Sequence, residues 1–173
     1  MENTDYNEVL IATLERIRAK IAANINSKGL RASGKTEASM FKPDSIRLTD
    51  TGAQLVAVGR GYFQSLELGR PAGRVPRGFA YIIRQWILDK GLSVRMIPYR
   101  RQPSERWQPK YSVEERSLRA AAGAIAHNIA TRGTRLYQQG GRSDIYTPVL
   151  EEETKRLEAE IGRIIANSIK QEL

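Results

Sequence analysis

Apolar side chains recur at helical spacing in four separate parts of the chain. Near the N-terminus they fall every three or four positions, which places them on one face of a helix. Gly29 follows this stripe and is typical of a helix C-cap. We therefore predict an N-terminal helix over residues 1–28, with its apolar face formed by Leu10, Leu14, Ile17, Ile21 and Ile25.

Three later segments carry the same helical period. One helix is predicted from Phe79 until Gly91 stops it, with Trp86 in the core. A second is predicted over 113–130, where small residues permit close packing, and a third over 148–173. Their apolar positions are Phe79, Ile82, Ile83, Trp86 and Ile87 in the first, Leu118, Ala121, Ala122, Ile125 and Ile129 in the second, and Leu150, Leu157, Ile161, Ile164, Ile165 and Ile169 in the third.

Between the first two helices the pattern favours β-structure. The runs 46–49 and 54–58 are rich in strand-forming residues, and they flank a turn of hairpin length that contains Gly52. A third strand is expected over 62–68. We predict an α+β fold, in which a small antiparallel sheet packs against about four helices. The predicted organisation is one domain over 1–173, with an α+β core over 45–147, extended loops at 93–112 and 132–147, and a C-terminal helix over 148–173.

Composition and charge narrow the function classes. The chain has 173 residues with 40% hydrophobic content, enough for one domain to bury a core without cross-links. It has no cysteine, which excludes disulfides and thiolate chemistry. Its longest apolar stretch is too short for a membrane span, and its start is not typical of a signal peptide. The net charge of +9 favours polyanionic partners.

One segment matches a nucleotide-binding pattern. Residues 29–36, GLRASGKT, fit G-x-x-x-x-G-K-[ST] at every fixed position. That chemistry requires a strand entering the loop and a helix leaving it, so that backbone N–H groups meet the phosphates. Here the predicted N-terminal helix enters, and Pro43 follows soon after. We interpret Gly29 to Thr36 as a helix C-cap and a basic loop.

No constellation of residues supports catalysis. His127 is the only histidine, so a site with several histidine ligands is excluded, and it lies off the apolar stripe of its helix. The run Glu151 to Glu153 opens the last helix, where negative charge complements the helix dipole without a further role. We predict a protein that is not an enzyme and holds no cofactor or metal.

Two short motifs carry a resemblance to a known family. The segment 61–92, GYFQSLELGRPAGRVPRGFAYIIRQWILDKGL, joins a Glu-x-Gly corner to a helix with a central Trp, and the later AIAHNI run ends in Gly-Thr. In this arrangement the chain resembles the tail-completion and neck proteins that join head and tail in long-tailed bacteriophages. The matching positions are Glu67, Gly69, Trp86, Gly91, Gly133 and Thr134.

The resemblance implies an architectural role. It implies a virion protein, assembled in the bacterial host cytoplasm, whose copies form a ring at the head–tail junction around the DNA channel. Its partners would be further copies of itself, neighbouring connector and tail proteins, and genomic DNA contacted without regard to sequence, with no membrane. We expect Arg70, Arg74 and Arg77 at the DNA-facing rim.

The irregular loops supply candidate contacts between subunits. Arginines and aromatic residues alternate over 95–111, a pattern that suits either a nucleic-acid surface or a protein-docking arm, and we favour the arm. For Glu67, a contact with an arginine of a neighbouring subunit and a locally satisfied corner carboxylate both stay open. The inter-subunit candidates are Glu67, Tyr99, Arg100, Arg101, Arg106, Trp107, Tyr111, Tyr137 and Tyr146.

Two other function classes remain as alternatives. A stand-alone nucleic-acid-binding protein would use the same charge without forming a ring. A nucleotide hydrolase built on Gly34, Lys35 and Thr36 is the less favoured alternative.

Overall fold

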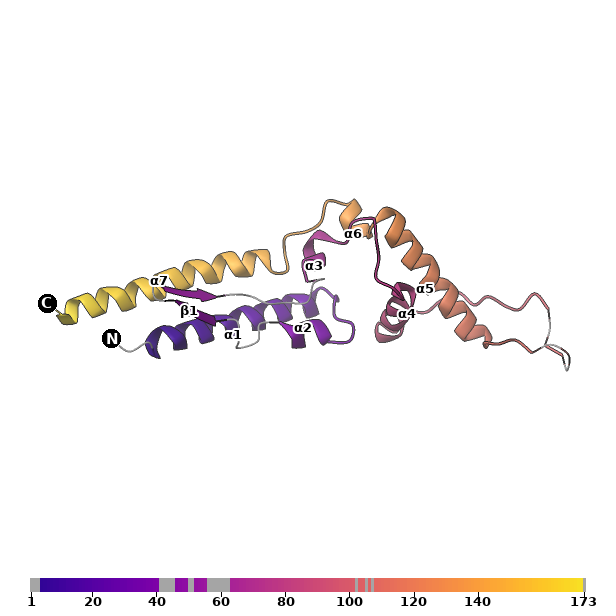
Figure 1. Ribbon diagram of the computed structural model, residues 1–173, viewed down its shortest axis with the longest axis horizontal. Helices are drawn as coiled ribbons and strands as arrows, with labels where there is room; N and C mark the ends of the chain where they lie inside the picture. Colours follow the sequence, from indigo (N-terminus) through magenta and orange to yellow (C-terminus); the bar gives the residue numbers. More distant parts are fainter. Residues whose placement is uncertain are drawn as a thin grey trace. The chain divides into compact units, whose positions relative to one another are not determined.

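The computed structural model describes residues 4–40, 46–49, 52–55, 63–101, 103–104, 106 and 108–172 (Figure 1). Two long helices, α1 (Thr4–Ser27) and α7 (Thr147–Glu172), begin and end the described chain. Between them lie α2 (Lys35–Ser39), β1 (Ile46–Thr49), β2 (Gly52–Leu55), α3 (Ser65–Leu68), α4 (Phe79–Asp89), α5 (Val113–Arg132) and α6 (Arg135–Gln138). None of the described helices is both long enough and apolar enough to cross a membrane.

The predicted α+β fold class is wrong, because the described chain is mostly helical. Its β-structure is a single short hairpin, in which β1 and β2 pair antiparallel from Ile46 opposite Leu55 to Thr49 opposite Gly52. No larger sheet occurs in the parts of the chain that the structure describes. The sequence pattern around Gly52 predicts two paired strands, and the structure has them. The predicted sheet also required a third strand over 62–68.

That third strand, expected over 62–68, is replaced by a helical turn. α3 is held by bonds from the Leu66 N–H to the Phe63 carbonyl and from the Leu68 N–H to the Gln64 carbonyl. The alternation of apolar and polar residues here suggested a strand, but the turn places Glu67 where its carboxylate has partners in a distant segment. A contact far apart in sequence therefore overrides the local pattern.

The chain divides into two compact units. Unit 1 contains Met1–Leu68 and Arg142–Leu173, and unit 2 contains Gly69–Gly141. In unit 1, the Arg142 N–H donates to the Glu67 carbonyl at 2.8 Å, so the two stretches that make up this unit meet beside α3.

The core of unit 1 lies along α1. All five apolar stripe residues predicted for this helix are buried, so the predicted N-terminal helix is confirmed. Met40, Ile145 and Val149 complete the buried cluster, and Phe63 and Tyr146 pack against it. α1 and α7 run antiparallel, since Arg16 pairs with Glu153 and Lys28 with Asp144.

The core of unit 2 is formed by α4 and α5. Ile83 and Ile87 on α4 pack against Leu118, Ala122 and Ala126 on α5, and the small alanines permit the close approach that the sequence predicted. The prediction that Trp86 belongs to the core is wrong, because 39% of its surface is exposed. α4 has apolar side chains on more than one face, so helical spacing alone did not show which face α5 covers.

Two short helices lie in segments that the sequence indicated as loops. α2 begins at the end of the predicted basic loop over 29–36, and α6 falls within the predicted loop over 132–147. The hydroxyl of Thr134 caps α6 by accepting the Tyr137 N–H, which is a standard N-cap arrangement.

Candidate functional site

The first candidate site is the corner built by Glu67. Its side chain is 2% exposed, and Oε1 accepts the backbone N–H groups of Ile145 and Tyr146, each at 2.7 Å. The same oxygen accepts the Thr147 N–H at 3.1 Å, and Oε2 accepts the Thr147 hydroxyl. These donors lie at the start of α7, where helix N–H groups have no partner inside the helix. Glu67 therefore caps a helix from a distant part of the chain.

The charge of Glu67 suits this position. Burial raises the free energy of the ionised carboxylate, but the hydrogen bonds from Thr147, Ile145 and Tyr146 outweigh it and hold the pKa of Glu67 below its ordinary value. The helix dipole at the start of α7 favours negative charge in the same way. Both carboxylate oxygens thus have partners within this chain. This is the locally satisfied carboxylate, one of the two arrangements that the sequence left open.

Unit 2 contains a close backbone crossing of its own. The Arg70 N–H donates to the Thr134 hydroxyl at 2.9 Å, and the Thr134 N–H donates to the Arg70 carbonyl at 2.8 Å. Gly69 has a φ of +70°, and a Cβ placed on it would lie 2.7 Å from the Thr134 Oγ1 and would also clash with the Tyr137 backbone. Only glycine fits at this crossing.

Gly133 has the same requirement on the other side of the crossing. Its φ is +77°, and a Cβ there would lie 2.7 Å from the Arg70 carbonyl oxygen and 3.0 Å from the Ala72 nitrogen. The Glu-x-Gly and Gly-Thr motifs, which are far apart in the sequence, therefore meet through Gly69, Arg70, Gly133 and Thr134. This meeting gives a physical reason for glycine at both positions.

The three arginines expected at a DNA-facing rim precede α4. Arg70 is half-buried, donates from Nη2 to the Arg74 carbonyl at 3.0 Å, and places its guanidinium 5.3 Å from the centre of the Phe79 ring. Its charge is therefore partly used within unit 2. Arg74 and Arg77 are exposed. Their role at a rim stays a prediction.

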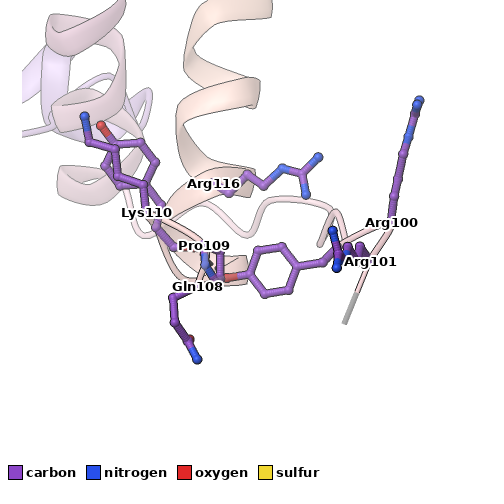
Figure 2. A pocket seen from close by; sticks show the side chains of 8 residues that line it. Arg100, Arg101, Gln108, Pro109, Lys110 and Arg116 are labelled. Carbon is purple, nitrogen blue, oxygen red and sulfur yellow. Dashed lines mark hydrogen bonds between the residues drawn. The ribbon is translucent and has the colours of Figure 1, made fainter. Parts of the chain in front are cut away.

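The second candidate site is an open hollow of about 510 Å³ in unit 2 (Figure 2). It is formed by the loop before α5 together with the first turns of that helix. Four of its side chains are cationic and two are tyrosines. The lining residues are Tyr99, Arg100, Arg101, Gln108, Pro109, Lys110, Tyr111 and Arg116.

The base of this hollow is fixed by internal contacts. The Tyr99 hydroxyl donates to the Tyr111 carbonyl at 2.5 Å, which closes the loop on itself. The Arg116 guanidinium lies 5.8 Å from the centre of the Tyr99 ring, and that of Arg119 lies 4.2 Å from the centre of the Tyr111 ring. The loop is anchored to α5, because the Ile97 N–H donates to the hydroxyl of buried Ser117 at 2.7 Å.

The structure gathers four of the predicted inter-subunit residues in the hollow: Tyr99, Arg100, Arg101 and Tyr111. Arg106 is exposed on the same loop, and Trp107 lies outside the described residues. Tyr137 is exposed on α6 in unit 2, whereas Tyr146 is half-buried in unit 1 with its ring centre 5.2 Å from that of Phe63. Burial and then the nearby Glu67 charge raise the pKa of Tyr146. The inter-subunit role of all these residues stays a prediction.

The sequence reasoning missed a buried charge between α1 and α7. Glu153 is fully buried, and its carboxylate pairs with Arg16 at 2.8 Å and with Lys20 at 2.7 Å. Burial disfavours its charge, yet the bonds from Arg16 and Lys20 lower the pKa of Glu153. From the sequence, the run Glu151 to Glu153 is explained by the helix dipole alone. The spacing of Arg16 and Lys20, one turn apart on α1, was a usable signal of a shared acidic partner.

The nucleotide-binding pattern does not have the surroundings that it requires. α1 ends at Ser27 just before Gly29, and the helix after Gly34 has five residues. His127 is exposed on α5. Within the described ranges, no group of three or more His, Asp or Glu side chains is placed to hold a metal ion.

Comparison with protein-family models, characterised proteins and solved structures gives no match to this chain. The corner, the hollow and the exposed apolar side chains are therefore the observations that bear on its function.

Proposed function

We propose that this chain is a structural virion protein of a tailed bacteriophage or prophage, which assembles as a ring at the head–tail junction around the DNA channel. The observation that carries the proposal is the backbone crossing in unit 2. Gly69 of the Glu-x-Gly motif and the Gly133-Thr134 motif meet there, with Thr134 bonded twice to Arg70 and a glycine required on each side. Chance matches spread along a sequence have no reason to converge on one backbone crossing.

Exposed apolar side chains support a protein that works by assembly. On α4, Ile82 and Trp86 are exposed at 50% and 39%, and on the last turns of α7, Ile165 and Ile169 are exposed at 46% and 55%. Apolar and aromatic side chains exposed together on a helix are typical of protein–protein contact surfaces. Each unit thus offers surface for another subunit.

A closed ring requires contacts of a particular kind. One patch on each copy must meet a different patch on the next copy, with a rotation that returns to the start. The apolar residues of α4 in unit 2 and of α7 in unit 1 are two such different patches. Neighbouring connector and tail proteins are the expected partners at the faces of the ring.

Genetic deletion with electron microscopy tests this function. We would delete the gene from its phage, induce the lysate and score joined particles against separate heads and tails. Filled heads beside unattached or abnormally ended tails are the expected result, with joined particles restored by a plasmid copy of the gene. Normal infectious particles without the gene would overturn the proposal.

A further inference from the structure

The hollow before α5 in unit 2 is strongly cationic. Arg100, Arg101, Lys110 and Arg116 all line it, and none of the described carboxylates does. No ion pair with a described carboxylate involves any of these four. The nearest contrast is Arg84, which also packs against α5 but pairs with Glu115 at 2.7 Å.

The arrangement of the four cations indicates the shape of the ligand. Figure 2 shows Lys110 on one side of the hollow, Arg100 and Arg101 together on the other side, and Arg116 between the two sides. A pocket for a single phosphate would instead bring its donors together at one point. A row of separated cations fits a long anion that carries its charges at intervals.

The row rests on a rigid base. Arg116 leaves a helix that Ser112 caps, and its guanidinium also donates to the Pro98 carbonyl at 3.4 Å. The bond between Tyr99 and Tyr111 closes the loop beneath it. Less conformational entropy is then lost when the ligand binds, because this part of the site is already ordered.

We propose that this hollow binds the phosphodiester backbone of nucleic acid, without regard to base sequence. Arg100, Arg101 and Lys110 are exposed and would contact successive phosphates, while Arg116 would hold the strand at the centre of the row. The inference deepens the proposed function, because it assigns the DNA contact to the loop before α5. The position of this contact in the virion rests on the proposed function.

An acidic peptide is the competing ligand, and the lining argues against it. Specific peptide docking uses apolar anchors that fill pockets, whereas Pro109 is the one aliphatic side chain among the described residues that line the hollow. Both of its tyrosine rings already have a guanidinium close by, from Arg116 and Arg119. The hollow therefore binds a ligand mainly through its cations, and a backbone with a phosphate at each nucleotide can pair with all of them.

The test measures binding of the purified full chain to a short fluorescent DNA duplex of arbitrary sequence over a range of salt concentrations. The key variant is Arg100→Ala with Arg101→Ala. Its affinity should fall at least about tenfold, and the slope of log affinity against log salt should decrease by about two, because two phosphate contacts are lost. The matched control is Lys155→Ala with Arg163→Ala, which removes the same charge from exposed positions on α7.

Two results would overturn the inference. One is an equal loss of affinity in both double variants, which would mean that only net charge matters. The other is competition by polyglutamate as effective as that by unlabelled DNA at the same charge concentration, which would mean that the hollow accepts any polyanion. Neither result depends on head–tail joining. A protein that fails to bind DNA but still restores joined particles would remove this inference and leave the proposed function standing.

Discussion

The Glu67 carboxylate oxygen Oε1 lies 2.7 Å from the backbone nitrogen of Ile145, which is 78 residues further along the chain. With its bonds to Tyr146 and Thr147, this contact fixes the start of α7 against α3. It brings together the two sequence stretches of unit 1, so stability of the unit should depend strongly on one side chain.

Replacing Glu67 with Gln should lower the free energy of unfolding by about 2 kcal/mol, because an amide accepts weaker bonds from the α7 N–H groups than a carboxylate does. Urea unfolding at neutral pH measures this. Glu158→Gln, at an exposed position on the same helix, is the control and should change little. An equal effect of both changes would contradict the capping role.

The same substitution should alter the response to acid. The pKa of folded Glu67 lies below the value of about 4.3 expected in the unfolded chain, so its contribution is present above that pH and is lost as pH falls through the folded pKa. The stability difference between the natural protein and Glu67→Gln should therefore be largest near neutral pH and should shrink in acid. Urea unfolding repeated down the pH range checks this, and a constant difference would be the contrary outcome.

Gly69→Ala should be far more harmful than Gly140→Ala. Both glycines have positive φ, so each alanine costs about 1–2 kcal/mol from backbone strain. A Cβ at Gly69 also clashes with Thr134 and Tyr137, whereas a Cβ at Gly140 meets nothing within 4 Å. Both variants share the backbone strain, so the difference between their melting temperatures measures the cost of the clash at the crossing. Equal melting temperatures would show that the crossing relaxes without cost.

Glu153→Gln should destabilise unit 1 by about 2 kcal/mol, because Arg16 and Lys20 lose the buried charge that they share. This is less than for a fully buried pair, because Arg16 and Lys20 are partly exposed to water. Glu152→Gln is the matched neighbour, since Glu152 is exposed and also pairs with Lys20. Thermal unfolding of the two variants should differ clearly, and similar curves would contradict a structural role for Glu153.

Trp86→Ala and Ile87→Ala separate assembly from folding on one helix. Ile87 is buried, so its loss should cost about 3 kcal/mol of stability. Trp86 is partly exposed, so its loss should cost less stability and should reduce the number of joined particles when the variant gene complements the deletion. Normal joining by Trp86→Ala would remove α4 from the subunit contacts.

The spacing of apolar residues was sufficient to predict the long helices, but it did not predict the segments that connect them. The stripe from Leu10 to Ile25 faces a core and is buried throughout, so periodicity located α1 well. On α7 the stripe ends in exposed Ile165 and Ile169, because α1 covers only part of that helix's length. The same reasoning placed Trp86 inside, although α5 covers another face of α4.

The Glu67 cap in unit 1 and the glycine crossing in unit 2 could each be predicted only in part. The resemblance to a family points to these residues, but their partners lie in segments far away in the sequence. No spacing rule connects Gly69 to Thr134 or Glu67 to Thr147, because such contacts depend on the tertiary path of the chain. The strand expected over 62–68 failed for this reason.

The bond between the Arg142 N–H and the Glu67 carbonyl has a consequence for how such a protein can evolve. The chain leaves unit 1 after Leu68 and returns at Arg142, so unit 2 is an insertion in the sequence of unit 1. A segment whose two ends are adjacent can be lengthened, exchanged or lost with little effect on the host fold. Changes of length in the loop of unit 2 should therefore leave the cap on α7 intact.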